Sequence, residues 1–155
     1  MYIGCVTQAV PAQDVVALTA TLVTYAGRLG RAVSRVAAPD LPAATLRLLA
    51  QLDELGPSGI SRLAKADRCS QPTMSAAVQH LVEKGWATKT ANPEDARSSL
   101  VQLSEAGRGV LDDARRRIGA VVAERLEADP RHDIADVAAA AALLQHLLPP
   151  EQGVQ

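Results

Sequence analysis

Aromatic residues are nearly missing from this sequence, which has no Phe, one Trp and two Tyr. Its core must therefore be built from Leu, Val and Ala. Such a core suits helices, because Ala and Leu are strong helix formers. The two cysteines, Cys5 and Cys69, form no CxxC pair and no disulfide framework. The longest apolar run, Val137 to Leu144, falls well short of the ~20 residues that a membrane span needs.

These absences leave an ordinary globular chain. It has 155 residues, of which 48% are hydrophobic and 21% are charged, and this length is typical of one domain. A chain of this size buries roughly 70% of its unfolded surface without a disulfide or a metal. The N-terminus lacks the basic region, apolar core and cleavage site of a signal peptide. The sequence therefore predicts a cytoplasmic protein that needs no cofactor.

The net charge of −1 hides an uneven distribution of charge. Residues 1–41 carry three Arg against two Asp, and residues 42–110 carry eight basic residues against seven acidic ones. Residues 111–155 carry five basic residues against eight acidic ones, so the acidic excess lies at the C-terminal end. Any surface that binds DNA must therefore be local.

Periodicity and turn residues predict a mainly α fold with a small β-hairpin. Ser58, Ser70 and Ser104 are expected N-caps, and Gly85 is expected to end a helix in the left-handed conformation. Turn residues from Asn92 to Arg97 separate the two strands. Helices are predicted over residues 14–38, 42–54, 61–67, 71–84, 104–128 and 133–148, and strands over residues 87–91 and 99–103.

Catalytic motifs are missing as well. The sequence has no HExxH, no GxSxG, no glycine-rich phosphate loop and no paired-cysteine metal motif. Its three histidines, His80, His132 and His146, lie on different predicted helices. A surface or capping role suits them better than a shared metal site. The sequence therefore predicts that the protein is not an enzyme.

The centre of the chain has the element order of a winged helix-turn-helix. A short helix, a turn around Cys69, a second helix and a β-hairpin follow one another. The second helix is slim enough for the major groove of DNA, which is about 12 Å wide. Polar side chains on a helix are more often simply solvated, so this order alone leaves DNA binding open. The candidate base-contacting residues are Ser70, Gln71, Thr73, Met74, Ser75 and Gln79, with Met74 expected to touch a thymine methyl group.

The hairpin provides a more specific signal. Residues 85–107 have the sequence GWATKTANPEDARSSLVQLSEAG, which resembles the wing of the MarR family of bacterial transcription regulators. The flanking helices also fit the dimerisation helices of that family. The positions in register with the family pattern are Gly85, Pro93, Asp95, Arg97, Ser98, Leu103, Ser104 and Gly107.

The resemblance implies that Arg97 enters the minor groove, where a narrow groove offers enhanced negative potential. Asp95 is expected to orient Arg97 through a salt bridge. The predicted recognition helix departs from the family pattern, because Ala76 and His80 stand where basic residues are frequent. Contacts with phosphates must therefore come from residues elsewhere, namely Arg62, Lys65, Arg68, Lys89 and the wing.

The resemblance also implies three parts within one integrated domain and a set of partners. Residues 1–41 form a leader and a dimerisation helix, residues 42–104 the winged helix-turn-helix, and residues 105–155 further dimerisation helices and a tail. The expected partners are a palindromic operator in double-stranded DNA, a second copy of the chain, and a small aromatic effector that releases a repressor, with no membrane involved. Candidate effector contacts are Tyr25, Arg28, Arg47 and Trp86.

Two alternatives remain open from the sequence. The near-neutral charge also suits a winged helix that binds another protein and has no role with DNA. Cys69, beside Arg68, would suit a regulator that senses oxidants, because a neighbouring cation lowers the pKa of a thiol. A buried, unreactive cysteine is the simpler interpretation of the same residue. Cys5 has no such neighbour.

Overall fold

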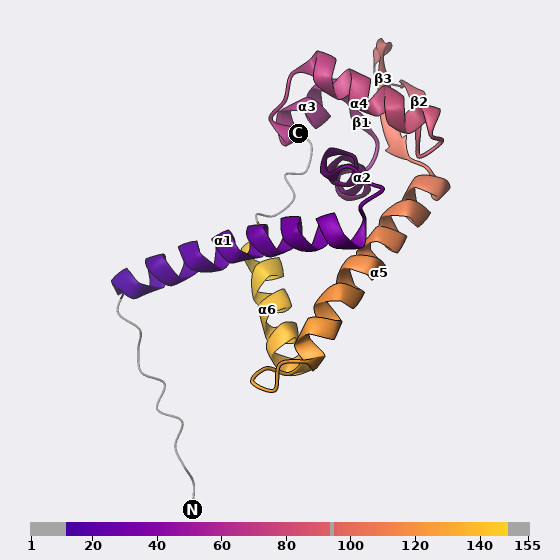
Figure 1. Ribbon diagram of the computed structural model, residues 1–155. Coiled ribbons are helices and arrows are strands. Elements are labelled where there is room, and N and C mark those ends of the chain that lie inside the picture. Colours follow the sequence, from indigo (N-terminus) through magenta and orange to yellow (C-terminus); the bar gives the residue numbers. More distant parts are fainter. Residues whose placement is uncertain (1–11, 94, 149–155) are drawn as a thin grey trace, which may run out of the picture.

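The computed structural model describes residues 12–93 and 95–148 (Figure 1). The expected leader before Pro11, Cys5, and the helix stop at Pro149–Pro150 lie outside the described residues. The helices are α1 (Ala12–Ala37), α2 (Ala43–Leu55), α3 (Ile60–Asp67), α4 (Gln71–Glu83), α5 (Glu105–Glu127) and α6 (Ile134–Leu147), and the strands are β1 (Ser58–Gly59), β2 (Ala87–Asn92) and β3 (Asp95–Leu103).

The predicted helices and the hairpin are confirmed, with one strand added. β1, β3 and β2 form an antiparallel sheet in that order. Ser58 pairs with Val101 across the sheet, so the expectation that Ser58 caps α3 is wrong. The cap position belongs to Gly59, which makes no side-chain hydrogen bond. A strand of two residues has no periodicity, and only its distant partner on β3 makes it a strand.

The core lies where α2, α3 and α4 meet the sheet and the start of α5. Leu49, Leu63 and Val78 are fully buried there, and Leu111 joins them from α5. A smaller cluster of Ala38, Leu41 and Ala114 connects the end of α1 to α5. The winged helix-turn-helix and the ends of the flanking helices therefore share one packed interior.

The junction between the wing and α5 is held against the end of α4. Ser104 caps α5 by accepting a hydrogen bond from the Gly107 backbone N–H at 3.0 Å, and its hydroxyl donates to the Gly85 carbonyl at 2.7 Å. Gly85 has a φ of +73°, as its predicted left-handed position requires. A Cβ atom on Gly107 would lie 2.0 Å from the Trp86 carbonyl oxygen. Glycine is therefore needed at Gly107 because two backbones meet there.

The remaining helices form extended arms. α5 leads away from the wing, and the N-terminal half of α1 extends beyond the winged helix (Figure 1). α6 begins with a capping box made by Asp133 and Asp136 and buries none of its side chains. The exposed large apolar residues of the described chain lie on α1 and on or next to α6, namely Val15, Val16, Leu18, Val23, Tyr25, Leu29, Val36, Ile134, Val137, Leu143, Leu147 and Leu148. None of the described helices is long and apolar enough to cross a membrane.

Candidate nucleic-acid interface

Helix α4 begins at a well-defined cap. Ser70 accepts a hydrogen bond from the Thr73 backbone N–H at 3.3 Å, and the two hydroxyl oxygens lie 2.8 Å apart. Pro72 occupies the first turn, where its missing N–H removes no helical bond. The predicted cap at Ser70 is confirmed. The cap therefore fixes where α4 begins.

The exposed side of α4 carries most of the predicted base-contacting residues. Gln71, Thr73, Ser75 and Gln79 are all exposed. Met74 is only 2% exposed and lies in the core. The expected contact between Met74 and a thymine methyl group is therefore wrong, because Met74 shares the buried face of α4 with residues four and seven positions later, Val78 and Leu81.

The polar side of α4 has no exposed arginine and ends in an ordered pair. The Gln79 side-chain amide donates to a Glu83 carboxylate oxygen at 3.1 Å. This bond fixes the direction of the Gln79 amide, which is a suitable group for an adenine edge. Glu83 also brings a negative charge to the helix, so cations from other elements must supply the attraction to phosphates.

The tip of the wing is held by the predicted turn residues, but not through the expected ion pair. An Asp95 carboxylate oxygen accepts a hydrogen bond from the Arg97 backbone N–H at 3.0 Å. Ser98 donates to the Asp95 carbonyl at 3.1 Å and accepts from the Asn92 side chain at 3.0 Å. Within the described residues, no salt bridge joins the Arg97 guanidinium to Asp95 or to another carboxylate. Asp95 shapes the turn instead, and Arg97 is exposed.

Cations flank α4 on both sides. Lys65 and Arg68 are exposed beside the turn, and Lys89 is exposed on β2. Arg62 is half-buried, and its guanidinium donates to the Ser58 hydroxyl at 3.4 Å. Arg68 has a φ of 54° and is the one non-glycine residue with a positive φ in the described chain. The neighbouring Cys69 is half-buried and packs against the core.

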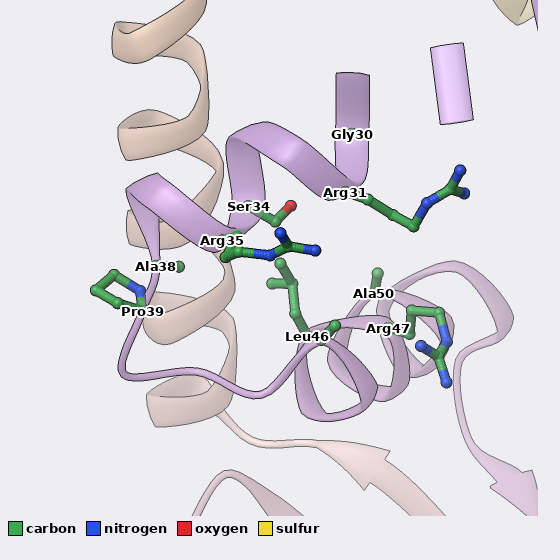
Figure 2. Close-up of a pocket in the computed structure, with 10 residues that line it drawn as sticks. Gly30, Arg31, Ser34, Arg35, Ala38, Pro39, Leu46, Arg47 and Ala50 are labelled. Carbon is green, nitrogen blue, oxygen red and sulfur yellow. The ribbon is translucent and has the colours of Figure 1, made fainter. Parts of the chain in front are cut away.

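An open pocket lies between α1 and α2, and we call it the α1–α2 pocket (Figure 2). Its volume is about 630 Å³. Of the predicted effector contacts, Arg47 lines it, whereas Trp86 lines a separate hollow of about 380 Å³ against α5. Tyr25 and Arg28 line neither and pair with each other on the surface of α1, with the guanidinium 5.4 Å from the ring centre. The sequence prediction missed Arg31 and Arg35, whose helical spacing was visible but whose position opposite α2 was not.

A charged clamp joins the winged helix to α5. Asp53 of α2 forms salt bridges with Arg108 and Arg115 of α5, the latter at 2.9 Å. The hydrogen bond from Arg115, together with the charges of both arginines, lowers the pKa of the Asp53 carboxyl. These salt bridges therefore join α2 of the winged helix to α5.

A helix-turn-helix followed by a β-hairpin that packs beside its second helix defines the winged helix-turn-helix class. Residues 41–99 match the model of the MarR family. The winged helix of this chain is therefore similar to that of the MarR family, whose members are transcription regulators. No curated protein sequence matches the chain.

Solved structures with the same fold come from several bacteria. A putative transcriptional regulator from Pseudomonas aeruginosa PA01 is 26% identical with a TM-score of 0.72, covering 88% of this chain and 96% of that one. Wild-type MarR from E. coli in its apo form is 22% identical with a TM-score of 0.63, covering 92% and 100%. A mutant of the E. coli MarR, complexed with operator DNA, is 21% identical with a TM-score of 0.57, covering 91% and 100%.

Proposed function

We propose that this protein is a sequence-specific DNA-binding repressor that acts as a homodimer and is released from its operator by a small ligand. The wing carries the proposal. Asp95 fixes the backbone of the turn, and Arg97 is exposed there without an ion pair among the described residues. An exposed guanidinium on a fixed backbone suits a narrow minor groove, where the potential is most negative. The mutant E. coli MarR with the same fold, complexed with operator DNA, supports it.

The division of roles follows from which side chains α4 exposes. Gln71, Thr73, Ser75 and Gln79 have hydroxyl and amide groups that bond base edges in the major groove. Ser70 holds the first turn of α4 in place as its cap. Arg62 and Lys89, together with Lys65 and Arg68, contact phosphates and set the register of the protein on the duplex.

A second copy of the chain covers the apolar side chains that α1 and α6 leave exposed. Leu18 and Val23 on α1, and Leu143 and Leu147 on α6, are each between 47% and 67% exposed. Exposed apolar side chains gathered on two helices indicate an interface between proteins. Residues 1–41 and 105–155 therefore supply the dimer contacts, while residues 42–104 bind DNA. A symmetric pair places two copies of α4 about one helical turn of DNA apart.

The first test is selection of bound duplexes from a random DNA pool, followed by a salt titration of the selected duplex. We expect an inverted repeat whose half-sites lie about one turn apart. If a folded, dimeric protein enriches no sequence at low salt, the DNA-binding role is wrong. The winged helix is then better explained as a module that binds another protein.

Replacement of Arg97 by Ala tests the role of the wing. The loss of one cation at the DNA should make the negative slope of log K against log salt less steep by about 0.9 and weaken binding to the selected duplex. Arg125→Ala is the matched control, because Arg125 is exposed in the last turn of α5, at the end of that helix far from the wing. Equal affinity and equal salt slope for Arg97→Ala and the wild type would contradict the proposed minor-groove contact.

A further inference from the structure

Gln79 and Glu83 form a hydrogen-bonded pair on the exposed side of α4. The Gln79 side-chain nitrogen lies 3.1 Å from a Glu83 carboxylate oxygen, four residues further along the helix. Both side chains are exposed. Within the described residues, no salt bridge involves Glu83, and its carboxylate makes no other side-chain hydrogen bond. Gln79 is therefore the one side chain of the described chain that Glu83 holds.

The chemistry of this pair decides which way the Gln79 amide faces. A carboxylate only accepts hydrogen bonds, whereas a side-chain amide has an oxygen that accepts and a nitrogen that donates twice. The nitrogen of Gln79 must therefore face Glu83, because its oxygen would be repelled there. One N–H is used in this bond. One N–H and the carbonyl oxygen of Gln79 remain available for a ligand.

A single donor beside a single acceptor matches the edge of adenine. In the major groove, adenine presents the N7 acceptor beside the N6 amino donor, whereas guanine presents two acceptors, N7 and O6. The two donors that guanine requires are both on the Gln79 nitrogen, and one of them is already bonded to Glu83. Cytosine and thymine each present one polar group there. The paired amide therefore favours adenine over the other three bases.

The position of Glu83 on α4 makes it a poor base contact in its own right. The N-terminal residues of a recognition helix contact the base edges, and Glu83 is the last residue of α4. It lies about 6 Å beyond Gln79 along the helix axis. A negative charge beside DNA also weakens the attraction to phosphates. A carboxylate here therefore lowers affinity, and its benefit lies in what it does to Gln79.

We propose that Gln79 contacts an adenine in each half-site of the operator, and that Glu83 is the positioning residue that sets this preference by holding one N–H of the Gln79 amide. The inference rests on the proposed DNA-binding function and names a base that it recognises. A hydrogen bond on an exposed helix is weak in water. It becomes stronger when the DNA excludes water from this side of α4.

Selection from a random DNA pool by the wild type and by Gln79→Ala identifies the base pair that Gln79 contacts, as the one whose preference disappears. Fluorescence anisotropy then compares four duplexes that differ only at this base pair. The wild type should prefer adenine by a factor of roughly 5 to 150, the range for a bidentate contact. A preference for another base at this position would overturn the adenine contact.

Glu83→Ala tests the positioning role on the same duplexes. It should reduce the preference for adenine over guanine by roughly 2- to 12-fold, because the freed amide turns to offer both donors. Affinity for an unrelated duplex should not fall. Glu54→Ala is the matched control, since it removes the same charge from an exposed position on α2 and should leave the base preference unchanged. An unchanged adenine preference in Glu83→Ala would overturn the positioning role.

The double variant Gln79→Ala/Glu83→Ala shows whether Glu83 acts through Gln79. It should have the same base preference as Gln79→Ala alone, because Glu83 then has no amide to hold. If Glu83→Ala changes the preference at a different base pair from Gln79→Ala, Glu83 contacts DNA itself and the inference is wrong. Circular dichroism confirms that each variant is folded, as expected for Ala at exposed helical positions.

The outcomes also separate this inference from the proposed function. If the wild type selects a duplex and Gln79→Ala selects the same sequence with the same preferences, the role of Gln79 is wrong and the DNA-binding role stands. If the folded wild type selects no duplex, the DNA-binding role is wrong and this inference is wrong with it.

Discussion

The winged helix buries its large apolar side chains, whereas α1 and α6 of the helical arms leave many of theirs exposed. In α4, Leu81 is 1% exposed, whereas Leu147 in α6 is 55% exposed. The winged helix buries its leucines between three helices and a sheet of the same chain. α6 buries no side chain at all. The contacts that stabilise the winged helix therefore lie within one chain, whereas α6 depends on a partner that covers its apolar side chains.

α5 belongs to both regions and shows where the change occurs. Near its start, Leu111 and Ala114 are buried against the winged helix and the end of α1. Further along, Ile118 and Val121 are only half-buried. Burial therefore falls off along one continuous helix, and α5 joins the arms to the winged helix through contacts that include the salt bridge between Asp53 and Arg115.

The largest expected effect is on the core of the winged helix. Leu81→Ala should lower the free energy of unfolding by about 2–5 kcal/mol, because it leaves a cavity among fully buried side chains. Urea denaturation at several protein concentrations measures the loss. His80→Ala, exposed on the same helix, should change stability by less than about 0.5 kcal/mol. Similar losses for both variants would mean that α4 is not packed as described.

A charge on α6 should disrupt the proposed dimer interface of the helical arms. Leu143→Asp places a carboxylate among exposed apolar residues, so it should convert a dimer into a monomer of 16.2 kDa, measured by analytical ultracentrifugation. Its winged helix should stay folded, and unfolding should no longer depend on protein concentration. Gln145→Asp adds the same charge two residues away on a different face of α6 and should leave the dimer intact. A Leu143→Asp protein that remains dimeric would exclude α6 from the interface.

The smallest expected effect is on the salt bridges of Asp53 with Arg108 and Arg115, which join the winged helix to α5. The pKa of Asp53 is lowered in the folded protein, so its contribution to stability is present above the usual Asp pKa of about 3.9 and is lost as the pH falls through the lower folded value. Asp53→Asn should therefore lower stability at neutral pH and reduce the loss of stability below about pH 4. Thermal unfolding from neutral pH to pH 2 measures both. An unchanged acid profile would show that the clamp contributes nothing.

Much of the fold could be predicted because its signals are local. The steps of three and four from Val15 to Val36 predict α1, and the serines at Ser70 and Ser104 mark the starts of α4 and α5. The wing is equally local, since Asp95 bonds the backbone only two residues away. The salt bridge expected for Asp95 was wrong because the same carboxylate satisfies the backbone N–H of Arg97.

By itself, the sequence determined the order of the helices, the hairpin, the caps at Ser70 and Ser104 and the exposed wing arginine, because each depends on residues within a few positions of one another. Only the tertiary structure decided three matters: that Ser58 joins a sheet through Val101, that Met74 faces the core, and that Arg31 and Arg35 stand opposite Arg47. Each of these depends on how one element packs against a distant one. Helical periodicity indicates which residues share a face, but only packing decides what that face meets.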